Sequence, residues 1–267
     1  MIKFFRKIRQ SSLVEGKTGK YLKYAIGEIL LVMIGILLAL QVSNWNKSRV
    51  DRHQEQAILR QLKTEFTNNL KQLDSKIYTK ESLMVSALKL FKYIDDPYIR
   101  NKDSLDLFLG RTIPFSTFDP IVNDLASSGN IRLIRSDSLK LLLSLWTSNI
   151  KDVQEDELGW KFYRNEFYIP FLVENYQLRT VRKIALEYGL LNGHLIESED
   201  QKNPLNNEFI GPSKYDVDIN VLLENPDFED HLERALSTNR FAHSQSLILK
   251  ERIEEILNII NKELDEE

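Results

Sequence analysis

The distribution of apolar and polar positions divides the chain into a short apolar stretch near its start and a long amphipathic remainder. Residues 24–43 are apolar almost without interruption and contain one charged side chain, Glu28. A helix of about 20 apolar residues spans the ~30 Å hydrocarbon core of a bilayer. The pattern therefore predicts a transmembrane helix over residues 24–43, a short segment before it (residues 1–23) and a large domain after it (residues 44–267).

Two other structures could produce this apolar stretch. A helix buried in a protein core is one, but core helices seldom lack a polar stripe so completely. A cleaved signal peptide is the other, but its apolar region is usually ~7–15 residues long and ends at a small-x-small site, which residues 38–41 do not offer. Tyr21 and Tyr24 at one end and Trp45 at the other are aromatic residues of the kind that anchor a span at the membrane interfaces. We therefore favour an uncleaved span.

The charges around the span predict its orientation. Residues 1–23 carry seven lysines and arginines against a single acid. Positively charged flanks stay in the cytoplasm, so we expect a cytoplasmic N-terminus and a translocated body. Lys47, Arg49 and Arg52 follow the span and weaken this bias without reversing it. The rest of the chain is net acidic, so we expect the lipid bilayer as a partner and no nucleic acid.

Glu28 is the most unusual residue of the span, because an acid inside a membrane is costly. Gly27, Gly35 and Ala39 lie near one face, where small side chains let a second helix approach closely. Three interpretations stay open for Glu28: a hydrogen bond across a helix–helix contact, an acid tolerated near the interface, and ion or proton transfer. We predict that Gly27, Glu28, Gly35 and Ala39 form a contact face, used in self-association or with another membrane protein.

The remainder of the chain has a helical period and no convincing run of alternating strands. A long first helix is predicted up to Asp96-Pro97, either as a stalk coiled coil or as the first helix of a bundle. Its expected apolar seam consists of Leu59, Leu62, Phe66, Leu70, Leu73, Ile77, Met84, Leu88 and Phe91. The last helix is expected to bury Leu249, Ile253, Ile256, Ile260 and Leu264. We expect these two helices to pack antiparallel.

Capping and breaking residues predict the elements between these helices. Asp119-Pro120 predicts a short helix that closes at Gly129, and Ser136 or Asp137 caps a helix that extends to about Tyr168, before Pro170. That helix should bury Leu139, Leu142, Trp146, Ile150 and Val153. Further predictions are a helix over residues 171–188, a surface loop near residues 190–216 and a helix start at residues 225–227. The fold class is all-α: one N-terminal transmembrane helix followed by a long-helix bundle or coiled-coil-like extracytoplasmic domain.

Three stretches carry a resemblance to a known family: MIKFFRKIRQ at residues 1–10, YAIGEILLVMIGILLALQVSNW at residues 24–45 and SSGNIRLIRS at residues 127–136. They resemble an uncharacterised family of small single-pass membrane proteins of Bacteroidota, known as a domain of unknown function. The resemblance implies a Gram-negative inner membrane and a periplasmic body. It implies no activity, because the family has none assigned.

Motifs for catalysis or cofactor binding are not found in the sequence. The chain has no cysteine, which excludes disulfides, Cys-based zinc sites and thiol catalysis. Its four histidines lie at no metal-ligand spacing, and we expect them at the surface. Phosphate-binding, nucleophile-elbow and dinucleotide-binding glycine motifs are absent. We therefore expect no catalytic residue, no metal and no cofactor. The four histidines of the chain are His53, His194, His231 and His243.

A dense aromatic stretch around residues 160–171 has two interpretations. Core packing explains it best, and a partner or ligand face formed by Trp160, Tyr163, Arg164 and Phe167 is the alternative. The function that these features favour is a membrane-anchored helical interaction or scaffold protein, acting in an oligomer or a membrane complex. A periplasmic ligand-sensing module comes second, because residues 1–23 are too few for an output domain. An enzyme of unknown class comes third.

Overall fold

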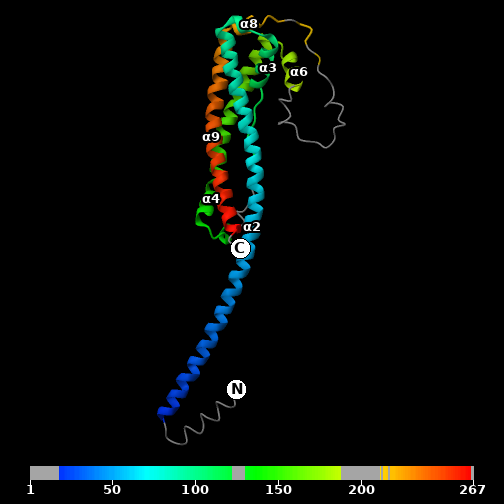
Figure 1. Cartoon of the computed structure of the whole chain (residues 1–267). Coiled ribbons are helices and arrows are strands. Elements are labelled where there is room, and N and C mark those ends of the chain that lie inside the picture. The colour runs from blue at the N-terminus through cyan, green and yellow to red at the C-terminus, as the bar shows by residue number, and fades with distance from the viewer. Residues whose placement is uncertain (1–17, 122–129, 188–210, 212, 216, 266–267) are drawn as a thin grey trace. The chain divides into compact units, whose positions relative to one another are not determined.

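The computed structural model describes residues 18–121, 130–187, 211, 213–215 and 217–265 (Figure 1). Every regular element in these ranges is a helix, so the predicted all-α fold class is confirmed. The elements are α2 (Thr18–Asp95), η1 (Pro97–Ile99), α3 (Lys102–Thr112), η2 (Asn130–Leu133), α4 (Asp137–Tyr163), the π-helix η3 (Arg164–Tyr168), α5 (Ile169–Asn175), α6 (Leu178–Glu187), α8 (Ile219–Leu223) and α9 (Pro226–Asp265). The chain forms two compact units, Met1–Ile58 and Leu59–Glu267, and each is described by itself.

Helix α2 contains both the predicted span and the predicted first helix of the body. The sequence pattern predicts these as two elements, whereas the chain makes them one helix of 78 residues. The physical reason is the absence of any helix breaker, since no glycine or proline occurs between Gly35 and Pro97. The first proline of the chain therefore decides where the helix stops.

The end of α2 is closed by two side chains. Asp96 accepts a hydrogen bond from the backbone N–H of Tyr98 at 2.9 Å and caps η1, which begins at Pro97. Arg100 donates to the carbonyl oxygens of Tyr93 (2.8 Å) and Ile94 (3.3 Å), which have no partner in the next helical turn. The prediction that Asp96-Pro97 ends the helix is confirmed.

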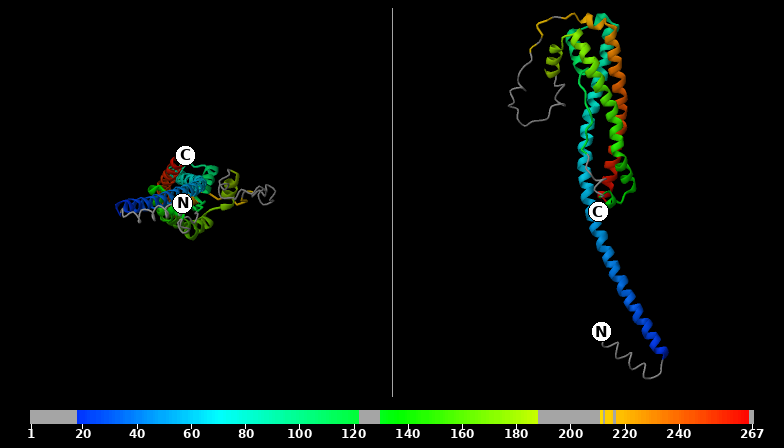
Figure 2. Two further views of the ribbon diagram at one scale, coloured as in Figure 1. Left: turned by 90° about the horizontal axis from the view of Figure 1, so that it is seen from below. Right: turned by 180° about the vertical axis from the view of Figure 1, so that it is seen from behind.

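The three longest helical segments of the body unit are the part of α2 after Ile58, α4 and α9. Figure 1 and the right panel of Figure 2 show them lying side by side. Lys250 of α9 pairs with Asp74 of α2 at 2.7 Å, and His243 pairs with Glu81 at 3.1 Å. Residue numbers rise along α2 while they fall along α9, so the two helices run antiparallel, as predicted.

The core confirms most of the predicted seams and corrects one of them. The apolar positions expected for α4 are all buried, and so are those expected for α9 up to Ile260. On α2 the predicted seam is correct up to Ile77 except at Leu70, which is half-buried beside the buried Asn69, and Leu88 further on is half exposed. The apolar residues of α2 buried after Ile77 are Leu83, Ala87, Leu90 and Tyr93. The true seam passes through Lys80, a polar residue, and apolar spacing alone skipped it.

The helix that begins at Ser136 continues past the proline predicted to stop it. Ser136 caps α4 through the Leu139 N–H at 3.4 Å, as expected. The backbone N–H of Ile169 donates to Arg164 O, five residues back, which makes the π-turn η3. This wider turn accommodates Pro170, which has no N–H to donate.

Around α3 and α6 the helices of the structure differ from those that the sequence predicts. The predicted helix over 171–188 is split at Tyr176, whose backbone is extended. Helix α3 was not predicted, because its eleven residues bury few apolar side chains. It packs against α6 at Gly110, where a Cβ would lie 3.5 Å from Val181 Cγ1. The helix predicted to start at Pro120 does not start there, and its remainder and most of the 190–216 loop lie outside the described residues.

The last predicted helix start is confirmed and extended. Asn225 accepts from the N–H of Asp227 at 3.0 Å, and Pro226 is the first residue of α9. The sequence pattern assigns this start and the final seam to separate helices. The structure joins them in one helix of 40 residues.

Candidate functional site

The first candidate site is the apolar part of α2. It is long and apolar enough to cross a membrane, by length and composition. Its large apolar side chains are 45–68% exposed, whereas apolar side chains in the interior of the body are at most 9% exposed. These exposed side chains are Leu22, Ile26, Ile29, Leu30, Leu31, Val32, Met33, Ile34, Ile36, Leu37, Leu38, Leu40 and Val42.

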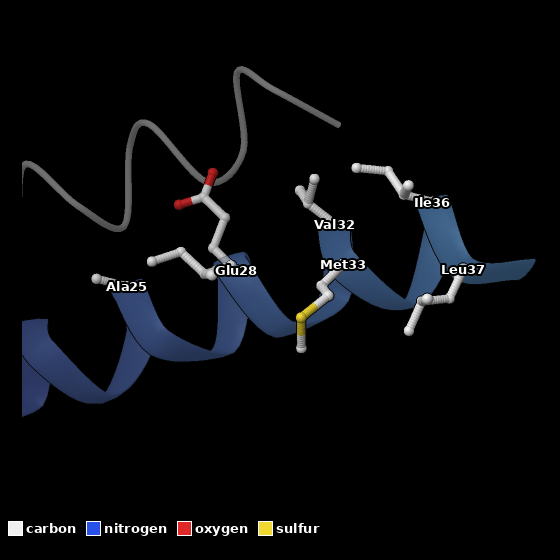
Figure 3. Close-up of a pocket in the computed structure, with 7 residues that line it drawn as sticks. Ala25, Glu28, Val32, Met33, Ile36 and Leu37 are labelled. Carbon is white, nitrogen blue, oxygen red and sulfur yellow. The ribbon is translucent and has the colours of Figure 1, made fainter. Parts of the chain in front are cut away.

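Glu28 projects from this helix among apolar neighbours. Figure 3 shows its carboxylate extending away from the ribbon, with Ala25 on one side and Val32 on the other. These side chains line a hollow together with Ile29, Met33, Ile36 and Leu37. The face therefore combines one carboxylate with aliphatic side chains, a composition suited to lipid or to another helix.

The small residues of the predicted contact face are open in the described structure. A Cβ added at Gly27 or Gly35 would meet no other atom within 4 Å. Ala39 lies in the same exposed stretch. A second helix on that face would come from another chain, so the contact of Gly27, Glu28, Gly35 and Ala39 stays a prediction.

Trp45 marks the end of the apolar stretch. Its side chain is 66% exposed, and the guanidinium of Arg49 lies 5.7 Å from the centre of its ring. Such a ring, apolar in its body and polar at its tip, fits the predicted anchor position. The side chains of Tyr21 and Tyr24, the anchors predicted at the other end, lie outside the described part of the structure.

The body contains a second arrangement that the sequence did not predict. Residues 114–121, here called the strap, are held by hydrogen bonds between their backbone and side chains of neighbouring helices. Asn69 accepts from the N–H of Ile121 (2.9 Å) and donates to its carbonyl oxygen (3.0 Å). Gln72 does the same for Asp119, at 3.0 Å in each direction. Both amides come from α2, one turn apart, so α2 satisfies four backbone groups of a segment without regular structure.

Helix α4 holds the strap from its other side. Gln154 donates to the carbonyl oxygen of Phe118 at 2.8 Å, and Glu157 accepts from the Phe118 N–H at 2.6 Å. The Phe118 ring is fully buried, 6.4 Å from the ring of Trp146. The strap is therefore anchored by one aromatic ring and by side-chain bonds to its backbone, and it bridges α2 and α4.

One buried ion pair joins all three long helices. Lys80 of α2 and Glu157 of α4, 3% and 2% exposed, meet at 2.5 Å, and Lys80 also donates to Ser246 of α9 at 3.2 Å. Burial lowers the pKa of Lys76, one turn before Lys80, while Glu157 acts in the opposite direction. A lysine that continues a heptad seam, as Lys80 does between Ile77 and Leu83, is the sequence signal that could have located this pair.

The aromatic stretch divides into a core part and a surface part. Trp160 and Tyr168 are buried, so Trp160 cannot belong to an exposed partner face. Tyr163 and Arg164 are half-buried, and Phe167 is half exposed. Core packing therefore explains the inner residues, as favoured from the sequence, and Phe167 with Tyr163 and Arg164 is what the surface retains of the predicted face.

His231 lies against this cluster instead of at the surface. Its Nδ1 is 2.9 Å from the hydroxyl of Tyr163, and its ring lies 4.6 Å from that of Phe171 and 5.7 Å from that of Tyr168. Burial lowers the pKa of His231, so the neutral ring is favoured. His243 is also half-buried, His53 is exposed, and His194 lies outside the described residues.

The buried ion pair and the amides that bind the strap have a structural role. Lys80, Glu157 and the strap-holding amides bond to other parts of the body; the bonds of Lys80 and Glu157 are buried, whereas those of Gln72 lie at the surface. A hollow of about 50 Å³ between α4 and α9, lined in part by Asp152 and Arg252, has room for a water molecule or two. Within the described ranges, no group of three histidine or carboxylate residues is placed to hold a metal ion.

Comparison with known proteins gives one match. A family described as a family of unknown function (DUF6090) matches residues 28–99, which cover most of the apolar stretch and the part of α2 in the body. No curated protein and no solved structure matches the chain. Over residues 28–99, this chain is thus similar to an uncharacterised family, as the resemblance of its apolar stretch had indicated.

Proposed function

We propose that this protein is a single-pass membrane protein of the inner membrane whose helical body acts as a scaffold in the periplasm. The observation that carries the proposal is the exposure of an entire apolar helical segment. All thirteen large apolar side chains described between Leu22 and Val42 are exposed, whereas the body has a buried apolar core beside exposed side chains such as Phe241. Each exposed aliphatic side chain costs ~1.5–3 kcal/mol in water relative to a covered one, so this segment needs a lipid environment.

The orientation part of the proposal rests on charge. The seven bases of residues 1–23 favour a cytoplasmic N-terminus, and a periplasmic body follows. A phosphatase that is active only outside the cytoplasm, fused after Glu267, should be active, and the same enzyme inserted within residues 1–20 should be inactive. The reverse pattern would overturn the orientation, and release of the chain from membranes by alkaline carbonate would overturn the anchoring itself.

The scaffold part of the proposal rests on how the body uses its polar residues. Lys80, Glu157 and the strap-holding side chains tie helices to each other, which suits a rigid support. The predicted contact face of Gly27, Glu28, Gly35 and Ala39, which is open at both glycines, would be used for assembly within the membrane, either with a second copy or with another membrane protein.

Cross-linking in native membranes tests the assembly directly, because the chain has no cysteine of its own. Gly35→Cys should form disulfide-linked dimers, or cross-links to a partner, in higher yield than Leu37→Cys, which lies about 200° around the same helix. Gly35→Leu should reduce assembly strongly because it holds the backbones apart, and Glu28→Gln should reduce it mildly. Equal cross-linking from both cysteine positions would show that this face is not used.

A further inference from the structure

The helix α2 carries two cations just beyond the apolar stretch, before its next acid. From Ile29 to Val50 the chain has no acidic residue, and Lys47 and Arg49 are its only charged side chains there. Both are exposed, and neither has a carboxylate partner in the described structure. Arg52, one turn further on, differs because it pairs with Glu55 at 2.9 Å.

The level of these cations along the helix corresponds to the headgroup layer of a bilayer. At 1.5 Å per residue, Lys47 and Arg49 lie about 3 Å and about 6 Å beyond Trp45. The polar headgroups occupy roughly 5–8 Å outside the hydrocarbon core on each side. If Trp45 marks the edge of the hydrocarbon, both cations lie at the depth of lipid phosphates.

The directions of the two side chains distinguish a lipid from a protein partner. Two residues along a helix correspond to a rotation of about 200°, so Lys47 and Arg49 point to nearly opposite sides. An acidic protein surface would meet one side of the helix only. Lipids surround a single span, so phosphates are available on both sides.

Arg49 is also placed for this contact by Trp45. Its guanidinium lies 5.7 Å from the centre of the indole ring, within the range of a cation–π interaction. A guanidinium can bind a phosphate with two parallel N–H donors, and stacking on the ring restricts it to the interface. Lys47, without such a ring, has the longer reach of a flexible stem.

We propose that Arg49 with Trp45 on one side of the helix, and Lys47 on the other, each bind the phosphate of an anionic phospholipid in the leaflet at the C-terminal end of the span. The site rests on the membrane anchoring proposed above. It makes this chain selective for acidic lipid at the place where the body leaves the membrane. The selectivity weakens with added salt, because the groups are exposed to solvent.

Trp45 serves as an internal reporter for the test. The other tryptophans, Trp146 and Trp160, are buried in the body and out of reach of lipid chains. The full-length protein is reconstituted in phosphatidylcholine vesicles that contain a minority of phosphatidylglycerol, with bromine on the acyl chains of one lipid or the other. Quenching of Trp45 by the two brominated lipids then gives the enrichment of the anionic lipid next to the helix.

We expect phosphatidylglycerol to be enriched about three- to fivefold around Trp45 at low salt. The double variant Lys47→Gln/Arg49→Gln should reduce the enrichment to about one, and Lys71→Gln/Lys89→Gln, which removes two exposed lysines of the body, should leave it unchanged. No enrichment in the unmodified protein, or the same enrichment in both double variants, would overturn the lipid site. If neither brominated lipid quenches Trp45, the membrane anchoring itself is wrong, so the two failures are distinguishable.

Discussion

Two leucines of the same helix show how differently the two units of this molecule use one residue type. Leu31 in the apolar stretch is 68% exposed, and Leu59 at the start of the body is fully buried. Helix α2 is continuous between them, so local conformation does not explain the difference. The difference shows that burial in this chain follows the surroundings available to each segment: other helices for the body, and lipid in our proposal for the apolar stretch.

Two lysines of α2 differ in the same way as the two leucines. Lys47 lies in the open next to the apolar stretch, whereas Lys80 is buried in the body. A buried charge without a partner is costly, and Lys80 is stable inside because Glu157 and Ser246 bond to it. The body therefore accepts polar residues in its interior wherever it can satisfy them.

The largest effects are expected from a new acidic residue in each region. Phe66→Asp should destabilise the body by at least about 4 kcal/mol, because it removes a buried ring that packs 4.9 Å from Trp146 and leaves an unpaired carboxylate. Ile256→Asp should act similarly on α9. Leu31→Asp should leave the body folded and reduce membrane insertion, by about 2.5–3.5 kcal/mol.

Urea unfolding in detergent, followed by the fluorescence of Trp146 and Trp160, measures the first effect. The fraction of the chain that sediments with membranes measures the second. If Leu31→Asp unfolded the body, or Phe66→Asp released the chain from the membrane, the two regions would not be independent.

A smaller loss of stability is expected when one charge of the buried ion pair is removed. Glu157→Gln removes one charge and leaves Lys80 buried without a counterion, which should cost about 3–5 kcal/mol of stability. Lys80→Met/Glu157→Gln should recover most of that loss, because no buried charge is left and the amide oxygen of the introduced glutamine can still accept from the Phe118 N–H. Urea unfolding of the single and double variants decides this, and a double variant no more stable than Glu157→Gln would contradict the account.

The strap is expected to contribute less than the ion pair. Asn69→Ala removes two hydrogen bonds to Ile121 and leaves backbone groups to find water, which should cost about 1–3 kcal/mol. Asn68→Ala, at the neighbouring exposed position, should change stability by less than about 0.5 kcal/mol. Hydrogen exchange of the Ile121 amide should rise in the first variant only, and unchanged exchange would show that Asn69 does not hold the strap.

The smallest effect concerns His231. Burial depresses its pKa in the folded state, against the attraction of Asp227 and Asp230, so the unfolded chain takes up the proton first as the pH falls. The body should therefore lose stability as the pH falls below the ordinary histidine pKa of about 6.5. His231→Phe should make the melting temperature less dependent on pH between 7 and 5, and His53→Gln, at an exposed position, should not. Equal pH dependence in all three proteins would contradict this.

The site residues differ in how far the sequence could locate them. Trp45 was predicted as an interface anchor because an aromatic residue at the end of an apolar run has a known preference; its side chain is exposed, and the anchoring stays a prediction. Trp160 was placed on a candidate face, but it lies in the core because the neighbouring turns of α4 point it inward. Lys80, Glu157 and Asn69 were missed because a polar residue in a heptad position looks like an interruption until its partner is known.

What the sequence by itself determined is the set of features that depend on local chemistry: the apolar stretch, the end of α2 at Asp96-Pro97, the start of α9 at Pro226 and the helical character of the regular elements in the described residues. These features need only propensity, capping and the period of apolar residues. Only the tertiary structure decided the shift of the seam at Lys80, the path of the strap and the passage of the helix past Pro170. Each of these depends on partners tens of residues away or on a locally widened turn, and no pattern of neighbouring residues specifies which donor will meet which acceptor.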